Sequence, residues 1–495
     1  MKKYNYLLIT TDQQRADTLG CVNPLVQTPN LDRLAQEGIL YNRAYTSNPV
    51  CTPSRISILT GHYPSTHGCY TIGTSLRKGY HTAAETLTES GYYTALCGKA
   101  HFQACLSPTS EEAIPFIQNR EYYKKWDGPY YGFQHAQLVI GHSVEAHCPG
   151  MHYGVWLEEH GVDSSKYFGN NEYTDFGQWD LPEEYSGSAF VCEKTVDAIR
   201  AAQEESKPFA IWASFQDPHN PCFVGKRWRD LYKPEDMPVY NYTPGEMDDR
   251  PEFYRGMAEN GDFGLEDKMN GKNWHCVSNL PFMGEQEKRE IMRSYYGMIS
   301  QMDFYVGKIM AYLEENHLRE NTIVVFTSDH GDYMGNHGLW WKGIPAYEDI
   351  QRVPLIVSHP ECRTPGAVSQ ALQSTIDIPC TFLQDAKLSI VGQQGKDEMP
   401  SWLDAHVTVR DHAFVEFRPS ESDFMQVTFI TDTYKLIMYH DLQWNELYDL
   451  SRDPEQKHNL WYKEEYQQVR FELMRKYISA QMEKDGVLQS RDAPA

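Results

Sequence analysis

The chain lacks the long apolar run that a membrane-spanning helix requires. No uninterrupted apolar stretch approaches the roughly 20 residues needed to cross a bilayer. The first apolar run, residues 6–10, is also too short for the core of a signal peptide, and no small-residue cleavage site follows it. We therefore expect no membrane partner and a cytoplasmic protein, or a periplasmic one if a leader has been removed.

The cysteines lack the spacing of a disulfide framework or of a structural zinc site. There are eleven of them, an odd number, at irregular intervals and with no CxxC pair. Disulfide scaffolds and zinc ribbons need even, closely spaced cysteines. The pattern favours a reducing compartment.

Positive charge is scarce. Lys and Arg number 45 against 68 Asp and Glu, so the formal net charge is −23. A surface of this sign repels phosphate backbones and anionic lipids, which excludes nucleic acid as an expected partner. An anionic substrate would be repelled at long range as well, and its pocket would need local cations and a metal ion.

Four apolar segments have the pattern of buried strands, and each ends in polar residues. They are residues 6–11, 92–97, 209–215 and 322–327. Near-continuous apolar runs of this length suit strands that are covered on both faces of a sheet. The polar residues that follow them are Asp12 and Gln13, Lys99 and His101, Asp217 and His219, and Asp329 and His330.

Helical patterns lie between these strands, over residues 28–37, 83–90 and 287–316. Alternating strands and helices predict an α/β fold, with a large, mostly parallel sheet flanked by helices. In such sheets ligands bind beyond the carboxyl ends of the strands. All four polar clusters are therefore expected at one edge of the sheet.

The length of 495 residues exceeds what one hydrophobic core usually supports. After residue 385 the pattern changes to short strand-like runs and a C-terminal helix. We predict a catalytic α/β domain over residues 1–385 and a small α+β domain over 386–495, an antiparallel sheet with a helix. Between residues 101 and 190 the periodicity is lost, and we expect either an elaborated loop region or a small subdomain, at the rim of the pocket.

The segment CTPSRISILTG, residues 51–61, contains the most informative cysteine. Pro53 suits a first helical turn and apolar residues follow it, so Cys51 should lie at a helix N-terminus. Arg55, four residues on, shares its face. The helix dipole and a guanidinium favour thiolate chemistry, although a lone cysteine is more commonly a buried structural residue.

This segment resembles the C-x-P-S-R-x-x-x-x-T-G signature of formylglycine-dependent type I sulfatases, in the alkaline phosphatase superfamily. Every specified position of that signature is matched here. Further segments resemble those of the same family in the same order, namely residues 28–38, 91–101, 328–342 and 445–460. Together they extend the resemblance over most of the chain.

The resemblance implies that a maturation enzyme oxidises Cys51 to formylglycine, whose hydrate attacks sulfur. It also implies one divalent metal ion, commonly calcium, with magnesium or manganese as alternatives. The implied ligands are Asp12, Gln13, modified Cys51, Asp329 and His330. Gln13 stands where the family usually has Asp, and His330 where many members have Asn, so the identity of the metal is left open.

The catalytic residues implied by the resemblance are Cys51, Arg55, Lys99, His101, His219 and Lys342. Arg55 would hold the formylglycine hydrate, while Lys99 and Lys342 would bind the sulfate oxygens. His101 would take a proton from the remaining hydroxyl and so restore the aldehyde, and His219 would protonate or polarise the leaving oxygen. The four histidines that we leave out of the site are His142, His147, His152 and His337.

The activity implied is hydrolysis of a sulfate ester, on a saccharide or on a small aryl or alkyl alcohol. The aromatic residues between positions 101 and 190 favour a sulfated carbohydrate, since aromatic rings stack on sugars. A phosphonate monoester or phosphate diester hydrolase of the same superfamily is the nearest alternative. A binding protein without catalysis and a thiol hydrolase with unmodified Cys51 are further ones. Self-association is possible, and the chain itself does not determine it.

Overall fold

The computed structural model describes most of the chain. The described residues are 3–140, 145–146, 148–172, 175–260, 283–419, 424–440 and 444–484. Within these ranges no helix combines the length and the apolar character that crossing a membrane would take. No disulfide links the ten cysteines they contain.

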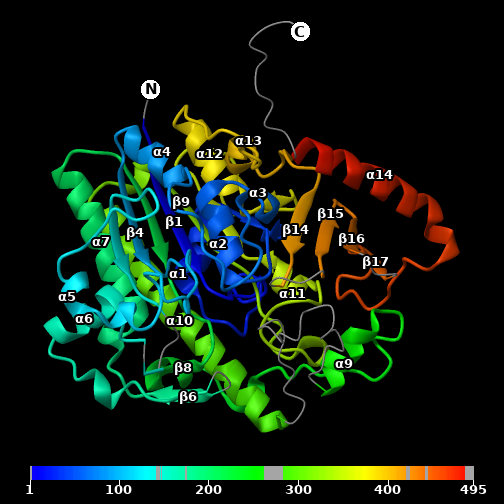
Figure 1. Cartoon of the computed structure of the whole chain (residues 1–495), viewed down its shortest axis with the longest axis horizontal. Coiled ribbons are helices and arrows are strands. Elements are labelled where there is room, and N and C mark those ends of the chain that lie inside the picture. Colours follow the sequence, from blue (N-terminus) through cyan, green and yellow to red (C-terminus); the bar gives the residue numbers. More distant parts are fainter. Residues whose placement is uncertain are drawn as a thin grey trace, which may run out of the picture.

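A mixed eight-stranded sheet forms the centre of the protein (Figure 1). Its strands, in spatial order, are β12 (Ala367–Ser369), β2 (Ile39–Tyr41), β11 (Leu355–Ser358), β9 (Thr322–Ser328), β1 (Asn5–Thr11), β7 (Phe209–Ser214), β4 (Tyr93–Gly98) and β5 (His135–Leu138). All neighbours are parallel except that β11 runs antiparallel to β9 and to β2. The four strands predicted from the sequence lie side by side in its middle, and the prediction of a mostly parallel α/β sheet is confirmed.

Both faces of this sheet are covered, as the apolar runs predicted. In β1, Leu7 and Ile9 pack into one hydrophobic core, whereas Tyr6 and Leu8 pack into a second core on the opposite face. The helices that contribute to the first core include α1 (Pro29–Glu37), α7 (Gly187–Glu204) and α10 (Glu285–Glu315), and those that contribute to the second include α2 (Cys51–Thr60), α4 (Ala83–Glu89) and α12 (Asp377–Asp385). The strands are therefore rigidly held, and so are the residues at their ends.

The segment between residues 101 and 190 is more regular than the sequence indicated. It contributes the parallel edge strand β5, the helices α5 (Arg120–Tyr123) and α6 (Met151–Glu159), and the strand β6 (Phe176–Trp179), which pairs with β8 (Cys222–Gly225). Of the two structures that the sequence left open, these elements do not fit an elaborated loop region. They are too short to show a period, because each has only four to nine residues.

Several aromatic side chains of this segment are buried. Tyr123, Tyr130, Tyr153 and Trp156 are each no more than 4% exposed and belong to the two cores. These four rings stabilise the fold and present no face to a sugar. The expectation that the aromatic residues of this segment form a sugar-stacking surface is therefore wrong for them.

The C-terminal part is an antiparallel sheet with a helix, as predicted. Its strands follow one another in the order β14 (Ala413–Phe417), β15 (Gln426–Ile430), β16 (Tyr434–Tyr439) and β17 (Asn445–Asp449). The helix α14 (Gln467–Lys484) packs Leu473 and Ala480 against Phe414 and Leu436 of this sheet. Trp402, which precedes the sheet, is buried in the second core of the large domain. The boundary at residue 385 stays a prediction.

The remaining elements are short. A three-stranded sheet has the order β10 (Arg352–Val353), β3 (Ala44–Tyr45) and β13 (Gln373–Ser374). The other α-helices of the described residues are α3 (Pro64–His67), α8 (Lys226–Arg229), α9 (Glu252–Asn260), α11 (Glu348–Gln351) and α13 (Met399–Leu403).

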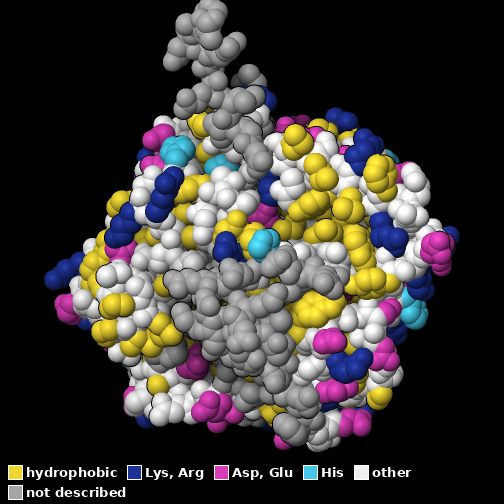
Figure 2. All heavy atoms as spheres, turned by 45° about the vertical axis from the view of Figure 1, so that its right-hand side comes forward, with side chains coloured by type: hydrophobic (Ala, Val, Ile, Leu, Met, Phe, Trp, Pro, Cys, Tyr) yellow, Lys and Arg dark blue, Asp and Glu magenta, His cyan; other side chains and the backbone are white. Residues whose placement is uncertain are grey.

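The outer face of α14 is apolar. Phe471, Met474, Ile478 and Met482 recur at helical spacing and are 37–72% exposed. The side of the molecule that carries the C-terminal sheet also shows groups of apolar side chains (Figure 2). Exposed apolar groups of this kind favour association, but the oligomeric state stays a prediction.

A buried ion pair connects α12 to the segment that leads into β14. Arg410 donates to both carboxylate oxygens of Asp377, with 2.8 Å between Nε and Oδ2, and both side chains are 1% exposed. Since Arg410→Ala leaves the Asp377 carboxylate buried without its cation, we expect a loss of about 3–5 kcal/mol in the free energy of unfolding. The midpoint of urea unfolding, followed by tryptophan fluorescence, measures this loss. Arg33→Ala, at a 47% exposed pair, is the control and should cost about 1 kcal/mol or less; equal effects of the two changes would contradict the prediction.

Candidate active site

The carboxyl ends of the central strands bring the predicted polar clusters together. Strands β1 and β9 pair in parallel up to Thr11 and Ser328, so Asp12 and Asp329 leave the sheet side by side. The backbone N–H of Asp329 still donates to Thr11 O at 3.2 Å. The sheet edge expected from the sequence is therefore where these two carboxylates meet.

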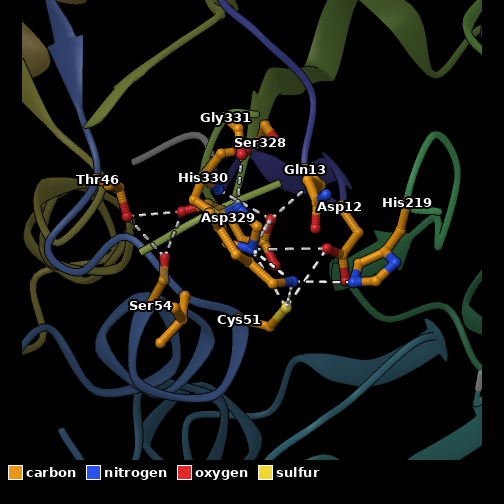
Figure 3. A network of polar contacts seen from close by, with 12 residues as sticks. Asp12, Gln13, Thr46, Cys51, Ser54, His219, Ser328, Asp329, His330 and Gly331 are labelled. Carbon is orange, nitrogen blue, oxygen red and sulfur yellow. Dashed lines mark hydrogen bonds and ion pairs between the residues drawn. The ribbon is translucent and has the colours of Figure 1, made fainter. Parts of the chain in front are cut away.

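Cys51 is the first residue of α2, as Pro53 and the apolar residues after it predicted. Every residue of this helix is buried, and Gly61 caps its C-terminus, with a φ of 69° and an N–H that donates to Ser57 O. The Cys51 sulfur lies 3.5 Å from Asp12 Oδ1 and 3.2 Å from His330 Nε2. Helix α2 thus delivers residue 51 to the ends of β1 and β9 (Figure 3).

Four side chains at this edge form a group that could hold a metal ion. The ligand atoms of Asp12, Cys51, Asp329 and His330 all lie within 4.8 Å of one another, and all four residues are buried. His330 Nδ1 lies 2.8 Å from Gly331 O, so Nδ1 carries the proton and the lone pair of Nε2 faces the group. Two carboxylates and an imidazole whose Nε2 faces them fit a divalent cation.

Gln13, the remaining predicted ligand, lies beside this group. Its side chain is fully buried, and its Oε1 has no hydrogen-bond donor among the described residues. A buried amide oxygen without a donor is costly unless a cation takes the donor's place. The residues present therefore fit a metal ion, with Gln13 as one possible ligand.

The backbone of Asp329 is fixed by hydroxyl groups that the sequence reasoning missed. Thr46 Oγ1 and Ser54 Oγ each donate to Asp329 O at 2.6 Å, and they lie 2.9 Å from one another (Figure 3). Ser54 could have been found from the sequence, because it is part of the signature at residues 51–61. Thr46 has no signal in the sequence, because only the fold brings it to β9.

Arg55 lies between the two carboxylates. Its Nε donates to Asp329 Oδ2 at 2.7 Å and its Nη2 to Asp12 Oδ2 at 3.3 Å, and the side chain is fully buried. Its Nη1 donates to Lys99 O and to Ser214 Oγ. Arg55 therefore holds the two carboxylates in place, and its predicted contact with a formylglycine hydrate stays a prediction.

Two buried lysines add positive charge to the site. Lys99 forms an ion pair with Asp12. Lys342 Nζ lies 2.8 Å from Cys51 Sγ, 2.9 Å from His219 Nε2 and 3.4 Å from His330 Nε2. Both lysines thus lie where the sequence predicted cations for an anionic group.

These charges change the acidity of the neighbouring groups. Burial alone would raise the pKa of the Cys51 thiol, but Lys342, Lys99 and His330 lower that pKa well below its usual range. Burial and the charge of Lys342 lower the pKa of His219 to about 3, so its imidazole is neutral. His219 Nδ1 donates to Asn220 O at 2.6 Å, and Nε2 accepts from Lys342.

The other histidines are distributed as follows. His101 is buried, and its interaction with Cys51 contributes to the lowered pKa of that thiol. His152 accepts from Leu138 N at 2.9 Å and so braces β5. His337 stacks on Tyr347 with ring centroids 3.8 Å apart and is not one of the four clustered ligands. His142 and His147 lie outside the described residues.

Comparison with known proteins agrees with the resemblance found in the sequence. A family model described as "Sulfatase" matches residues 4–388. A second model, described as "N-sulphoglucosamine sulphohydrolase, C-terminal", matches residues 335–483.

Individual relatives cover almost the whole chain. The arylsulfatase of Clostridium perfringens is 28% identical over 97% of this chain and 95% of its own length. The N-acetylglucosamine-6-O-sulfatase of Bacteroides thetaiotaomicron is 24% identical over 96% of this chain and 85% of its own length. The crystal structure of a phosphonate monoester hydrolase of Agrobacterium radiobacter shares the fold, with a TM-score of 0.77 and 22% identity over 97% of this chain and 96% of that one. With a family model that covers most of its length, the chain belongs to the sulfatase family of sulfuric ester hydrolases, in the alkaline phosphatase superfamily.

Proposed function

We propose that this sulfatase hydrolyses a sulfate ester on a carbohydrate, with formylglycine at position 51 as its nucleophile and a divalent cation beside it. The observation that carries the proposal is the position of Cys51 Sγ, 3.2 Å from His330 Nε2 and 2.8 Å from Lys342 Nζ. Residue 51 thus touches both a metal-ligand group and a cation suited to a sulfate oxygen. A thiol hydrolase would need a His and a carboxylate that serve the sulfur alone. Here His330 and Asp12, which contact the sulfur, belong to the metal-ligand group, so this alternative fits less well.

The ion would be held by Asp12, Gln13, Asp329, His330 and residue 51. Bound there, it would polarise the sulfate oxygens and stabilise negative charge on them. We propose calcium, because the donors are mainly oxygen atoms, with magnesium or manganese as alternatives since His330 supplies nitrogen.

The other side chains have separate tasks in this proposal. The hydrate of formylglycine supplies the attacking oxygen. Lys99 and Lys342 bind the non-bridging sulfate oxygens in a buried site, where their charge acts without screening by water. His219, which contacts Lys342, would polarise the leaving oxygen, and His101 would take the proton of the hydroxyl that remains on residue 51.

The name of a relative supports a carbohydrate as the alcohol that carries the sulfate. The N-acetylglucosamine-6-O-sulfatase that covers 96% of this chain is named for a sulfated sugar. An exposed sulfate on a saccharide is therefore our first candidate substrate, ahead of simple aryl or alkyl sulfates. Maturation by a formylglycine-generating enzyme and a cytoplasmic location, or a periplasmic one if a leader is removed, complete the proposal.

Replacement of Cys51 tests the nucleophile. We expect Cys51→Ala to lower turnover by about 10³-fold or more, because no neighbouring group can replace the attacking oxygen. The melting temperature should change little. Cys192→Ala, at another buried cysteine, is the matched control and should keep its activity. Near-normal activity of Cys51→Ala, or a thiol mass for the peptide spanning position 51 in active enzyme, would overturn the assignment.

The choice between sulfate and phosphonate esters is tested by direct comparison. We expect kcat/KM for nitrophenyl sulfate to exceed that for a phenylphosphonate ester by orders of magnitude, since the motif at residues 51–61 has the sulfatase spelling. Defined sulfated saccharides should be better substrates than nitrophenyl sulfate. The reverse order of the two aryl substrates would favour the phosphonate monoester hydrolase that we consider as the alternative.

Removal of the metal tests the ligand group. Chelation should abolish turnover and lower the melting temperature, because Asp12 and Asp329 then lose their shared cation. Calcium at about 100 times its Kd should restore about 2.7 kcal/mol of stability, which differential scanning calorimetry detects. Asp329→Asn should remove most of this calcium-dependent shift. Activity and a melting temperature that do not change on chelation would contradict the metal assignment.

A further inference from the structure

The amide of Gln13 is held in one orientation by two acceptors. Its Nε2 donates to Asp332 Oδ2 at 2.5 Å and to Asn220 Oδ1 at 3.0 Å. All three side chains are at least 96% buried. Both N–H groups of the amide are therefore used, and its oxygen is the one polar atom that they leave to other partners.

The reverse orientation of this amide is excluded by charge. Exchanging its nitrogen and oxygen would place Oε1 against Asp332 Oδ2, two acceptors at hydrogen-bond distance in a buried site. The backbone of Gln13 is also fixed, since its N donates to Asp329 Oδ1 at 3.0 Å and its O accepts from Tyr295 OH at 2.7 Å. Its φ of 67° is unusual for a residue other than glycine, and such conformations collect at functional sites.

The second oxygen of Asp332 holds another part of the site. Oδ1 accepts from Met334 N at 2.8 Å and from Trp341 N at 3.0 Å. Trp341 directly precedes Lys342, whose Nζ lies 2.8 Å from the Cys51 sulfur. One buried carboxylate thus contacts both Gln13 and the turn that presents Lys342.

We propose that Asp332 is a positioning residue that, with Asn220, aims the Gln13 oxygen at the metal ion and couples the metal to the turn carrying Lys342. The proposal rests on the metal of the proposed function and adds a reason why position 13 is an amide. A carboxylate there would face Asp332, like charge against like charge. Gln13 and Asp332 are therefore a matched pair: the proposed ligand is a neutral amide, and the negative charge lies on the residue that accepts its N–H.

Asp332→Asn tests the orientation of the amide. The Asn oxygen can still accept from Met334 N and Trp341 N, while its NH₂ faces the NH₂ of Gln13. Two donors then oppose each other, and the Gln13 oxygen turns away from the metal to relieve this contact. We expect the affinity for Ca²⁺, measured by calorimetric titration without substrate, to fall about 10–100-fold.

A charge-exchanged double variant supplies the rescue. Gln13→Glu alone places two carboxylates together and should weaken Ca²⁺ binding. Gln13→Glu combined with Asp332→Asn restores one donor opposite one acceptor between positions 13 and 332, with the same total charge as the wild type. Asn220 must then turn its amide so that its NH₂, instead of Oδ1, faces the carboxylate introduced at position 13. We expect its affinity for Ca²⁺ to return to at least that of the wild type. A general loss of packing cannot produce this recovery.

Asp303→Asn is the matched control. Asp303 is also a buried carboxylate, but it accepts from Leu31 N and Asn30 N at the start of α1, away from the ligand group. Its Ca²⁺ affinity should stay at the wild-type value. Wild-type affinity for Asp332→Asn, or a double variant as weak as the single ones, would overturn the proposal.

A calcium-loaded crystal structure of the wild type gives a readout that needs no variant to fold. The Gln13 oxygen should lie about 2.3–2.6 Å from the ion, with the amide nitrogen still on Asp332. An ion coordinated without Gln13, or failure of the wild type to bind Ca²⁺, Mg²⁺ or Mn²⁺, would end the inference. A wrong substrate or an inactive Cys51 would instead change turnover and leave these metal measurements intact.

Discussion

The guanidinium of Arg55, fully buried between Asp12 and Asp329, joins the parts of the chain that form the site. It connects α2 with the ends of β1 and β9, whose carboxylates would otherwise repel each other at close range. Burying charges costs several kcal/mol for each ion, and only close pairing offsets that cost. The charged groups of the site therefore stabilise one another, because each is paired with an opposite charge from another element.

Local and overall charge differ in sign around the nucleophile. The chain has a net charge of −23, yet Lys99, Lys342 and Arg55 converge on the region around residue 51. Buried charges interact strongly because little water screens them, whereas surface charges are screened within about 10 Å. A negatively charged protein can in this way offer a locally positive site to a negatively charged ester.

The sequence predicted the middle of the fold better than its edges. Strands β1, β4, β7 and β9 were visible as apolar runs because they are buried on both faces. The edge strand β5 was missed, since half of its residues are only partly buried and its four-residue length shows no period. The aromatic residues of the same segment suggested a sugar-binding surface, but composition cannot distinguish an aromatic residue in the core from one at a rim.

By itself the sequence determined which residue types are available for catalysis, through the signature at residues 51–61 and the polar residues after each strand. It also determined the α/β class, because the periods of apolar residues are local properties of the chain. Only the tertiary structure decided that Lys342 lies 2.8 Å from Cys51, 291 positions away, and that Asp332 and Asn220 turn the Gln13 amide. Distances and orientations of this kind depend on how the sheet packs, and no local pattern records them.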